Sequence, residues 1–186
     1  MNYRGDVSST GDFNAFLQEV RPQAGVLIKW HFNSIWSMGI ETGFGQINGH
    51  DFNHENVDRG YEVNANLFQI NAVTDINFKK FGKFYQRNQN TPFVKLGFGM
   101  LSYSPQVPKN TTFPPDLIIY PNSYFGTNFL VGFGWKWRVS MHSMISLDAV
   151  YHFTNVDNLE GFQELGTTST NDRYFGIRAV YSYGIF

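Results

Sequence analysis

The strongest constraint in this sequence is a two-residue alternation between large apolar residues and small or charged ones. It is clearest at 128–138, where apolar residues fill every second position from Phe129 to Trp137 and Gly132 and Gly134 lie between them. Such a period predicts a β-strand whose two faces meet different surroundings. The same pattern recurs at 23–32, 36–45, 68–78, 93–103, 145–153 and 174–183. The sequence therefore predicts an all-β fold with seven full strands.

An eighth strand is expected in the stub that ends before Gly5 and Asp6, paired with the last strand. Single-chain bacterial barrels have an even number of antiparallel strands, which favours this arrangement. We therefore predict that residues 1–186 form one domain, an eight-stranded antiparallel transmembrane β-barrel with a short first strand. The only segment whose pattern allows a turn of helix is 14–20. No signal peptide is evident at Met1, which indicates a trimmed or misassigned start.

The amount of apolar side chain favours a membrane barrel over a soluble one. The interior of an eight-stranded barrel is just wide enough for side chains to fill, or to hold one small ligand. The alternating apolar set is too large for that space, whereas the opposite faces are rich in Gly. Aromatic residues make up 18% of the chain and charged residues only 16%, and no apolar run is long enough for a transmembrane helix. We expect the apolar set to face the lipid of the outer membrane, with a soluble barrel as the alternative.

The charged residues that share the opposite faces carry both signs, so they can neutralise one another inside the barrel. Facing lipid at the bilayer midplane, each Arg or Lys would cost about 2–4 kcal/mol. The predicted network in the lumen consists of Lys29, Glu41, Asp75, Lys95, Lys136, Arg138, Asp148, His152 and Arg178.

All four Trp residues are expected at one end of the barrel. Trp30 and Trp36 flank the first short turn, and Trp135 and Trp137 precede the third. Both turns must lie at the same end, so these residues predict an aromatic girdle at one membrane interface. Short turns are periplasmic in such barrels, which assigns the girdle to the periplasmic side.

Two groups of residues contain the residue types of a reactive site, one of a catalytic triad and one of a metal site. Neither group is expected to form such a site. Ser146, Asp148 and His152 share one strand face, but at ~3.3 Å per residue they extend over about 20 Å, too far for a catalytic triad. The polar loop at 48–60 holds residues spaced as metal ligands: His50, Asp51, His54, Glu55 and Asp58. Loops carry such residues by chance, so we expect no metal site and no cofactor. The chain has no Cys, which excludes disulfides and thiolate chemistry.

Two connections could meet partners. The connection 79–91 is basic and aromatic, and its cations are Lys79, Lys80, Lys83 and Arg87. They could dock another envelope protein or an anionic surface, or could lie in the lipid headgroup region. The apolar run 117–120 in the third long loop either folds over the barrel mouth or meets a partner. With a net charge of −1, the chain as a whole has no electrostatic attraction for nucleic acid, so we expect none to bind.

Several short segments resemble a known family. They are Tyr3-Arg4-Gly5-Asp6, Arg21-Pro22-Gln23-Ala24-Gly25, Asn66-Leu67-Phe68-Gln69-Ile70, and Thr91-Pro92-Phe93-Val94-Lys95-Leu96-Gly97-Phe98-Gly99, with Trp36 following the first turn. Together they resemble the outer-membrane β-barrel family of Bacteroidota that includes the type IX secretion component PorG. The resemblance implies a porin-like fold without transport, an association with secretion or gliding machinery, and no catalytic residues.

The function expected from the sequence is therefore non-enzymatic. The barrel would anchor or scaffold a protein complex at the outer membrane, through its loops or the connection 79–91. The alternatives are a barrel enzyme acting on lipid or peptide, and a small pore.

Overall fold

The computed structural model describes residues 2–4, 23–50, 62–81, 87–105, 117–119, 122–156, 162–164 and 172–183. For 2–4, 47–50, 62–63, 117–119 and 162–164 it describes the backbone alone. The helical turn expected at 14–20 lies outside these residues. The described part of the chain contains no helix long and apolar enough to cross a bilayer.

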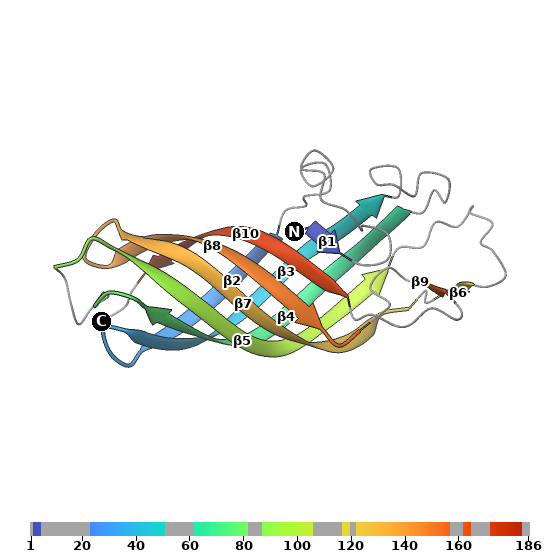
Figure 1. Ribbon diagram of the computed structural model, residues 1–186, viewed down its shortest axis with the longest axis horizontal. Helices are drawn as coiled ribbons and strands as arrows, with labels where there is room; N and C mark the ends of the chain where they lie inside the picture. Colours follow the sequence, from blue (N-terminus) through green and yellow to red (C-terminus); the bar gives the residue numbers. More distant parts are fainter. Residues whose placement is uncertain are drawn as a thin grey trace.

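One antiparallel sheet of eight strands dominates the fold (Figure 1). Its strands are β1 (Asn2–Arg4), β2 (Gln23–His31), β3 (Trp36–His50), β4 (Glu62–Asn77), β5 (Asn90–Pro105), β7 (Tyr124–Arg138), β8 (Ser143–Thr154) and β10 (Arg173–Tyr183). Their spatial order is β1-β10-β8-β7-β5-β4-β3-β2. A second sheet pairs β6 (Leu117–Ile119) with β9 (Phe162–Glu164). The prediction of an all-β antiparallel fold is confirmed.

The sheet curves into a half-barrel. The seven long strands follow one another in the sheet as they do in the chain, with β6 and β9 left out in a separate sheet. The short β1 lies on the outer edge of β10 and pairs with it from Asn2 to Arg4. The strands run obliquely to the long axis, and the short connections gather at the left of Figure 1. We call this the turn end, formed by the described residues of the connections 32–35, 78–89 and 139–142. The opposite end is called the loop end.

The two faces of the sheet have opposite chemistry. On the inner face the buried residues include many polar ones, among them Gln69, Asn71 and Asn128. On the outer face large apolar side chains are exposed, such as Phe98 at 60% and Phe133 at 54%. Along β7 exposed and buried residues alternate strictly from Asn128 to Trp137, as the sequence pattern predicts. The inner face thus combines many polar residues with apolar ones, whereas the interior of a water-soluble domain is mostly apolar.

Several strands are longer at the loop end than the sequence indicated. β3 continues to His50, so it includes the first residues of the predicted loop 48–60. β4 begins at Glu62, directly after that loop, and β5 ends at Pro105. Near the loop end the buried residues of the inner face are mainly apolar. They form a cluster of Ala65, Leu67, Leu101, Tyr103 and Tyr174. At the turn end β5 begins at Asn90, which shortens the predicted connection 79–91.

Side-chain hydrogen bonds fix the two tightest turns. Asn33 Oδ1 accepts hydrogen bonds from the backbone N–H groups of Ile35 and Trp36, both at 2.8 Å. Ser140 Oγ accepts from the N–H groups of His142 at 3.2 Å and Ser143 at 3.0 Å. Asn and Ser favour turns because their side chains can replace backbone partners in this way. These two turns therefore set the register of the hairpins β2–β3 and β7–β8.

The inner-face glycines are required by close approach. A Cβ atom on Gly99 would lie 2.1 Å from the carbonyl oxygen of Ile70 in β4. Such a contact with backbone cannot be relieved by a rotamer change. Gly99 thus allows β4 and β5 to follow the curvature of the sheet.

We predict that Gly99→Leu prevents the sheet from forming, because the new side chain meets the backbone of β4. The refolded fraction, followed by β-sheet circular dichroism and protease resistance, should fall sharply. Ala72→Leu is the matched control, since Ala72 pairs with Phe98 on the outer face. Normal refolding of the Gly99 variant would contradict the close packing described here.

Candidate functional site

The centre of the inner face holds a closed ring of four charges. Lys95 Nζ lies 3.2 Å from Glu41 Oε2 and 3.0 Å from Asp148 Oδ2. Arg178 completes the ring, because its guanidinium pairs with Glu41 and lies 2.6 Å from Asp148 Oδ2. Each cation therefore contacts both anions. The ring joins β3, β5, β8 and β10 and brings the side chains of β3 and β10 together across the interior.

A second group of charges lies nearer the turn end. Asp75 Oδ2 pairs with Lys29 and lies 2.8 Å from Lys136 Nζ, so one carboxylate serves two ammonium groups. Lys136 also donates to Asn77 Oδ1 at 3.0 Å, and its Nζ lies 4.1 Å from the ring centre of Phe93. The amide and the aromatic face solvate the second positive charge.

The ring and the Asp75 group together take one charged residue from each of the seven long strands. They are Lys29, Glu41, Asp75, Lys95, Lys136, Asp148 and Arg178. We call this set the interior charge network. Gly39 pairs with Lys29 and Gly132 with Lys95 in neighbouring strands, so long side chains can cross the interior.

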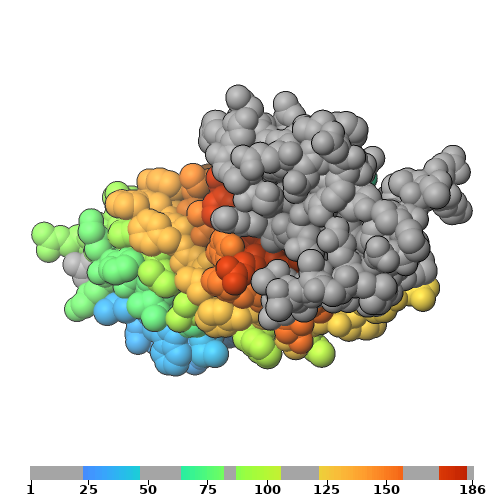
Figure 2. Space-filling view, turned by 45° about the vertical axis from the view of Figure 1, so that its right-hand side comes forward, coloured from blue at the N-terminus to red at the C-terminus, as the bar shows by residue number. Residues whose placement is uncertain are grey.

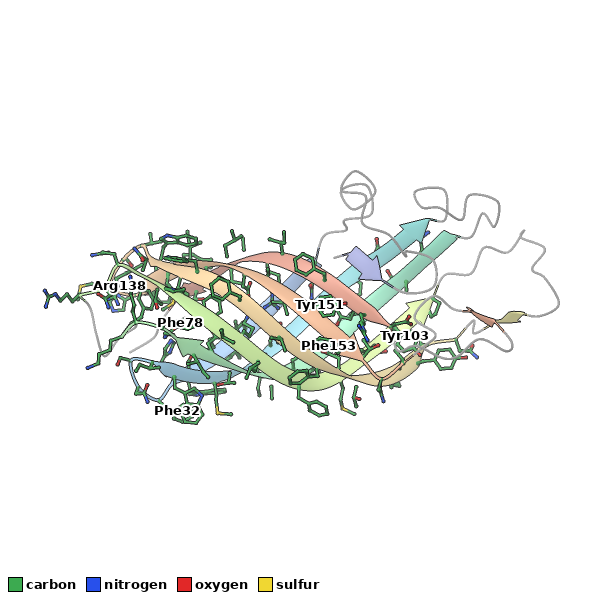
Figure 3. The ribbon with its side chains drawn as sticks, viewed as in Figure 1. Phe32, Phe78, Tyr103, Arg138, Tyr151 and Phe153 are labelled. Atoms are coloured by element: carbon green, nitrogen blue, oxygen red, sulfur yellow. The ribbon has the colours of Figure 1, made fainter. Side chains whose placement is uncertain are left out.

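Two further residues expected in the network have other surroundings. Arg138 lies at the end of β7, where its guanidinium carbon is 5.3 Å from the ring centre of Phe81 (Figure 3). His152 lies toward the loop end, where its Nδ1 is 3.2 Å from Asn128 Oδ1 and its ring stacks on Tyr174. Both therefore extend the polar interior without joining the ion pairs described above.

Amide and aromatic groups fill the interior between the charges and the loop end. Asn128 Nδ2 donates to Asn71 Oδ1 at 2.8 Å, and Tyr174 Oη donates to Gln69 Oε1 at 2.7 Å. The stacked rings of His152 and Tyr174 have centroids 4.2 Å apart. Beyond them lies the apolar cluster of Ala65, Leu67, Leu101 and Tyr103. These residues separate the ion pairs from the loop end.

Phe81 closes the interior at the turn end. Its side chain is 1% exposed, and its N–H donates to the Ser34 carbonyl at 2.7 Å. Phe93 is also buried, beside the Lys136 ammonium. The phase of the alternation placed Phe93 inside, but Phe81 lies in an irregular connection that carries no periodic signal. Its position is a result of the tertiary structure alone.

Among the described residues, Ser146, Asp148 and His152 do not assemble into a catalytic triad. Asp148 is paired with Lys95 and Arg178, and His152 is held by Asn128 and Tyr174. Ser146 is buried in β8 on the same face. No group of three His, Asp or Glu that could hold a metal ion occurs among the described residues. The side chains of the loop 48–60 that suggested a metal site lie outside the described set.

The four Trp residues all lie next to the turn end, on the outer face. Trp30, Trp36, Trp135 and Trp137 are 56%, 42%, 38% and 42% exposed. Trp36 Nε1 donates to Thr74 Oγ1 at 2.6 Å, and its ring stacks on Phe32. Figure 3 shows Phe32 projecting from the outer face at this end. The arrangement combines exposed aromatic surface with a satisfied polar group.

The basic connection begins directly after Phe78, the aromatic residue that follows β4. Phe78 is 65% exposed, and the next two residues, Lys79 and Lys80, are exposed as well. Arg87 is exposed at the other end of the connection, whereas Lys83 lies outside the described residues. The backbone is fixed at both ends, since Lys79 N–H donates to Thr91 Oγ1 at 3.1 Å and Asn88 Nδ2 donates to the Lys80 carbonyl at 2.9 Å.

A family model described as "Domain of unknown function (DUF6089)" matches residues 1–181. The chain belongs to the DUF6089 family. No curated protein matches the chain, and no solved structure does.

We predict that Asp75→Asn destabilises the fold by about 3–5 kcal/mol, because it leaves Lys29 and Lys136 as uncompensated buried charges. Equilibrium unfolding in urea would measure the change. Asp75→Asn combined with Lys136→Met should recover part of the loss, since one unpaired ammonium is removed. Arg173→Gln, on the exposed side of β10, should change stability by less than about 1 kcal/mol. Equal effects of Asp75→Asn and Arg173→Gln would refute a stabilising role for the network.

Proposed function

We propose that this chain is an outer-membrane β-barrel that anchors or scaffolds a membrane protein complex without catalysing a reaction. The observation that carries the proposal is the inverted distribution of polarity. Apolar side chains are exposed over the outer face, and the interior charge network is buried. In Figure 2 the side chains of β7, β8 and β10 form a continuous part of the outer surface. Lipid is the solvent that makes such a surface stable.

Closure into an eight-stranded barrel is part of the proposal. β1 extends the sheet beyond β10, and Glu41 of β3 contacts Arg178 of β10 across the interior. Both features support a closed barrel, in which the two edge strands of the sheet, β1 and β2, meet. The exposed Trp residues beside the turn end then form the girdle at the periplasmic interface.

The contents of the interior support an anchoring role rather than a pore. From the turn end toward the loop end, the interior holds first Phe81 and Phe93, then the interior charge network, and then amides and an apolar cluster. The charged groups of the network are held by ion pairs, by the Asn77 amide and by the Phe93 ring, so they offer no free binding site for a permeating ion. The proposal accordingly assigns function to the ends and not to a channel. Planar bilayer recordings should give no stepwise single-channel current.

An anchoring protein needs surfaces that meet its partners. The connection 78–89 and the loops at the opposite end are the proposed contact regions, with other envelope proteins as partners. The resemblance to PorG-like barrels suggests the type IX secretion or gliding machinery of Bacteroidota as the complex. Extraction in mild detergent followed by identification of co-purifying envelope proteins tests the assignment. An isolated monomer under those conditions would count against the scaffold.

A charge on the outer face tests the membrane assignment directly. Phe98→Arg places a guanidinium in the middle of β5, where lipid would make it cost about 2–4 kcal/mol in stability. Phe125→Arg is the matched control, because Phe125 is 77% exposed near the loop end and an interfacial Arg should cost only about 0–1 kcal/mol. Urea unfolding in phosphatidylcholine vesicles measures both. In a soluble barrel neither change would be destabilising, so equal small effects would overturn the proposal.

A further inference from the structure

The charges of this chain are divided unequally between its two ends. None of its 15 Asp and Glu residues falls in the turn-end connections 32–35, 78–89 and 139–142. Of its 14 Lys and Arg residues, four fall there, and all four lie in 78–89. Among these connections, positive charge is therefore confined to the one between β4 and β5. Snorkelling alone would place cations around the whole circumference.

The described cations of this connection are presented from a fixed backbone. Phe81 is buried and bonded to Ser34, and the N–H of Arg138 donates to the Gln89 carbonyl at 2.8 Å. Between these anchors and beside them, Lys79, Lys80 and Arg87 are exposed. A rigid backbone reduces the conformational entropy lost when the cations bind a ligand.

The position of the cations selects the chemistry of the ligand. Phe78, directly before Lys79, is 65% exposed and contacts Phe133 edge to face with ring centroids 6.5 Å apart. An apolar surface thus changes to a pair of ammonium groups within one residue, next to the turn end where Trp135 and Trp137 are exposed. An anionic phospholipid has the complementary arrangement, with acyl chains next to a headgroup of net negative charge, whereas the choline of phosphatidylcholine cancels the charge of its phosphate. An acidic protein segment would meet the cations but leave the aromatic surface unmatched.

We propose that Lys79, Lys80 and Arg87 form a binding site for the headgroup of an anionic phospholipid in the leaflet at the turn end. The exposed rings of Phe78 and Phe133 contact its acyl chains, and the cations bind its phosphate. This site rests on the proposed membrane-barrel function and extends it, since it fixes the barrel in the leaflet by a specific lipid contact.

The test uses the full chain in nanodiscs containing phosphatidylcholine and phosphatidylglycerol in equal amounts. Spin-labelled lipids report, by electron paramagnetic resonance, which lipid is immobilised on the protein. The chain should prefer phosphatidylglycerol, and each cation replaced by Gln should lower that preference by up to about fivefold. The combined variant Lys79→Gln, Lys80→Gln, Arg87→Gln should show no preference. Lys79→Arg with Lys80→Arg should retain it.

Two controls distinguish a lipid site at these three cations from a general effect of net charge and from a site for free phosphate. Arg59→Gln, Lys109→Gln, Arg173→Gln changes the net charge equally at residues outside the turn-end connections, and should leave the preference intact. Inorganic phosphate in the buffer should not displace the labelled lipid, because it lacks acyl chains. Persistence of the preference in the triple Lys79, Lys80, Arg87 variant, or its loss in the control variant, would overturn the site. So would displacement by inorganic phosphate.

The same samples distinguish failure of this inference from failure of the proposed function. The triple variant should insert into pure phosphatidylcholine nanodiscs as completely as the unmodified chain. Insertion of both without lipid preference would overturn the lipid site alone. Failure of both to insert would overturn the membrane barrel on which it rests.

Discussion

The interior charge network is the interaction on which the rest of this structure depends. Each of the seven long strands contributes one charged side chain, and these four cations and three anions form ion pairs in the centre of the sheet. The Asn77 amide and the Phe93 ring lie beside the Lys136 ammonium, which shares Asp75 with Lys29. The side-chain period of a strand is two, so a slip of one residue in any strand would turn its charge to the outer face. The network therefore requires the observed register, and the turns at Asn33 and Ser140 make that register easy to reach.

Pairing of the charges in the interior also explains the composition of the outer face. Because the charges are held inside by ion pairs, an amide and an aromatic ring, the outer face can be largely apolar without leaving these ions unpaired. The glycines beside the charged residues also make the network possible, since they provide the space in which Lys29 and Lys95 cross the interior. The conformational entropy that Gly adds to the unfolded chain is offset by the contacts it allows. An interior filled by ion pairs, amides and apolar clusters leaves the ends of the molecule as the places for function.

The two ends differ in chemistry. At the turn end, aromatic rings and cations lie close together on an ordered backbone with no acidic residue in the connections. Interfaces between hydrocarbon and headgroup favour this combination. In the proposed membrane barrel, this asymmetry defines which end faces which side of the bilayer, and the proposed lipid site lies at the turn end.

Sequence alone determined the seven long strands, their two faces and the type of residue on each, because alternation of period two is a local property that needs no tertiary information. It did not predict β6 and β9, which pair in a second sheet. It also placed the interior charges and Trp135 beside the third turn. It could not determine which charges pair, since the ring of Glu41, Lys95, Asp148 and Arg178 joins strands far apart in the chain. Nor could it show that Phe81 closes the turn end or that β3 continues to His50. Those features depend on how the sheet curves, and curvature brings together residues whose separation along the chain carries no pattern.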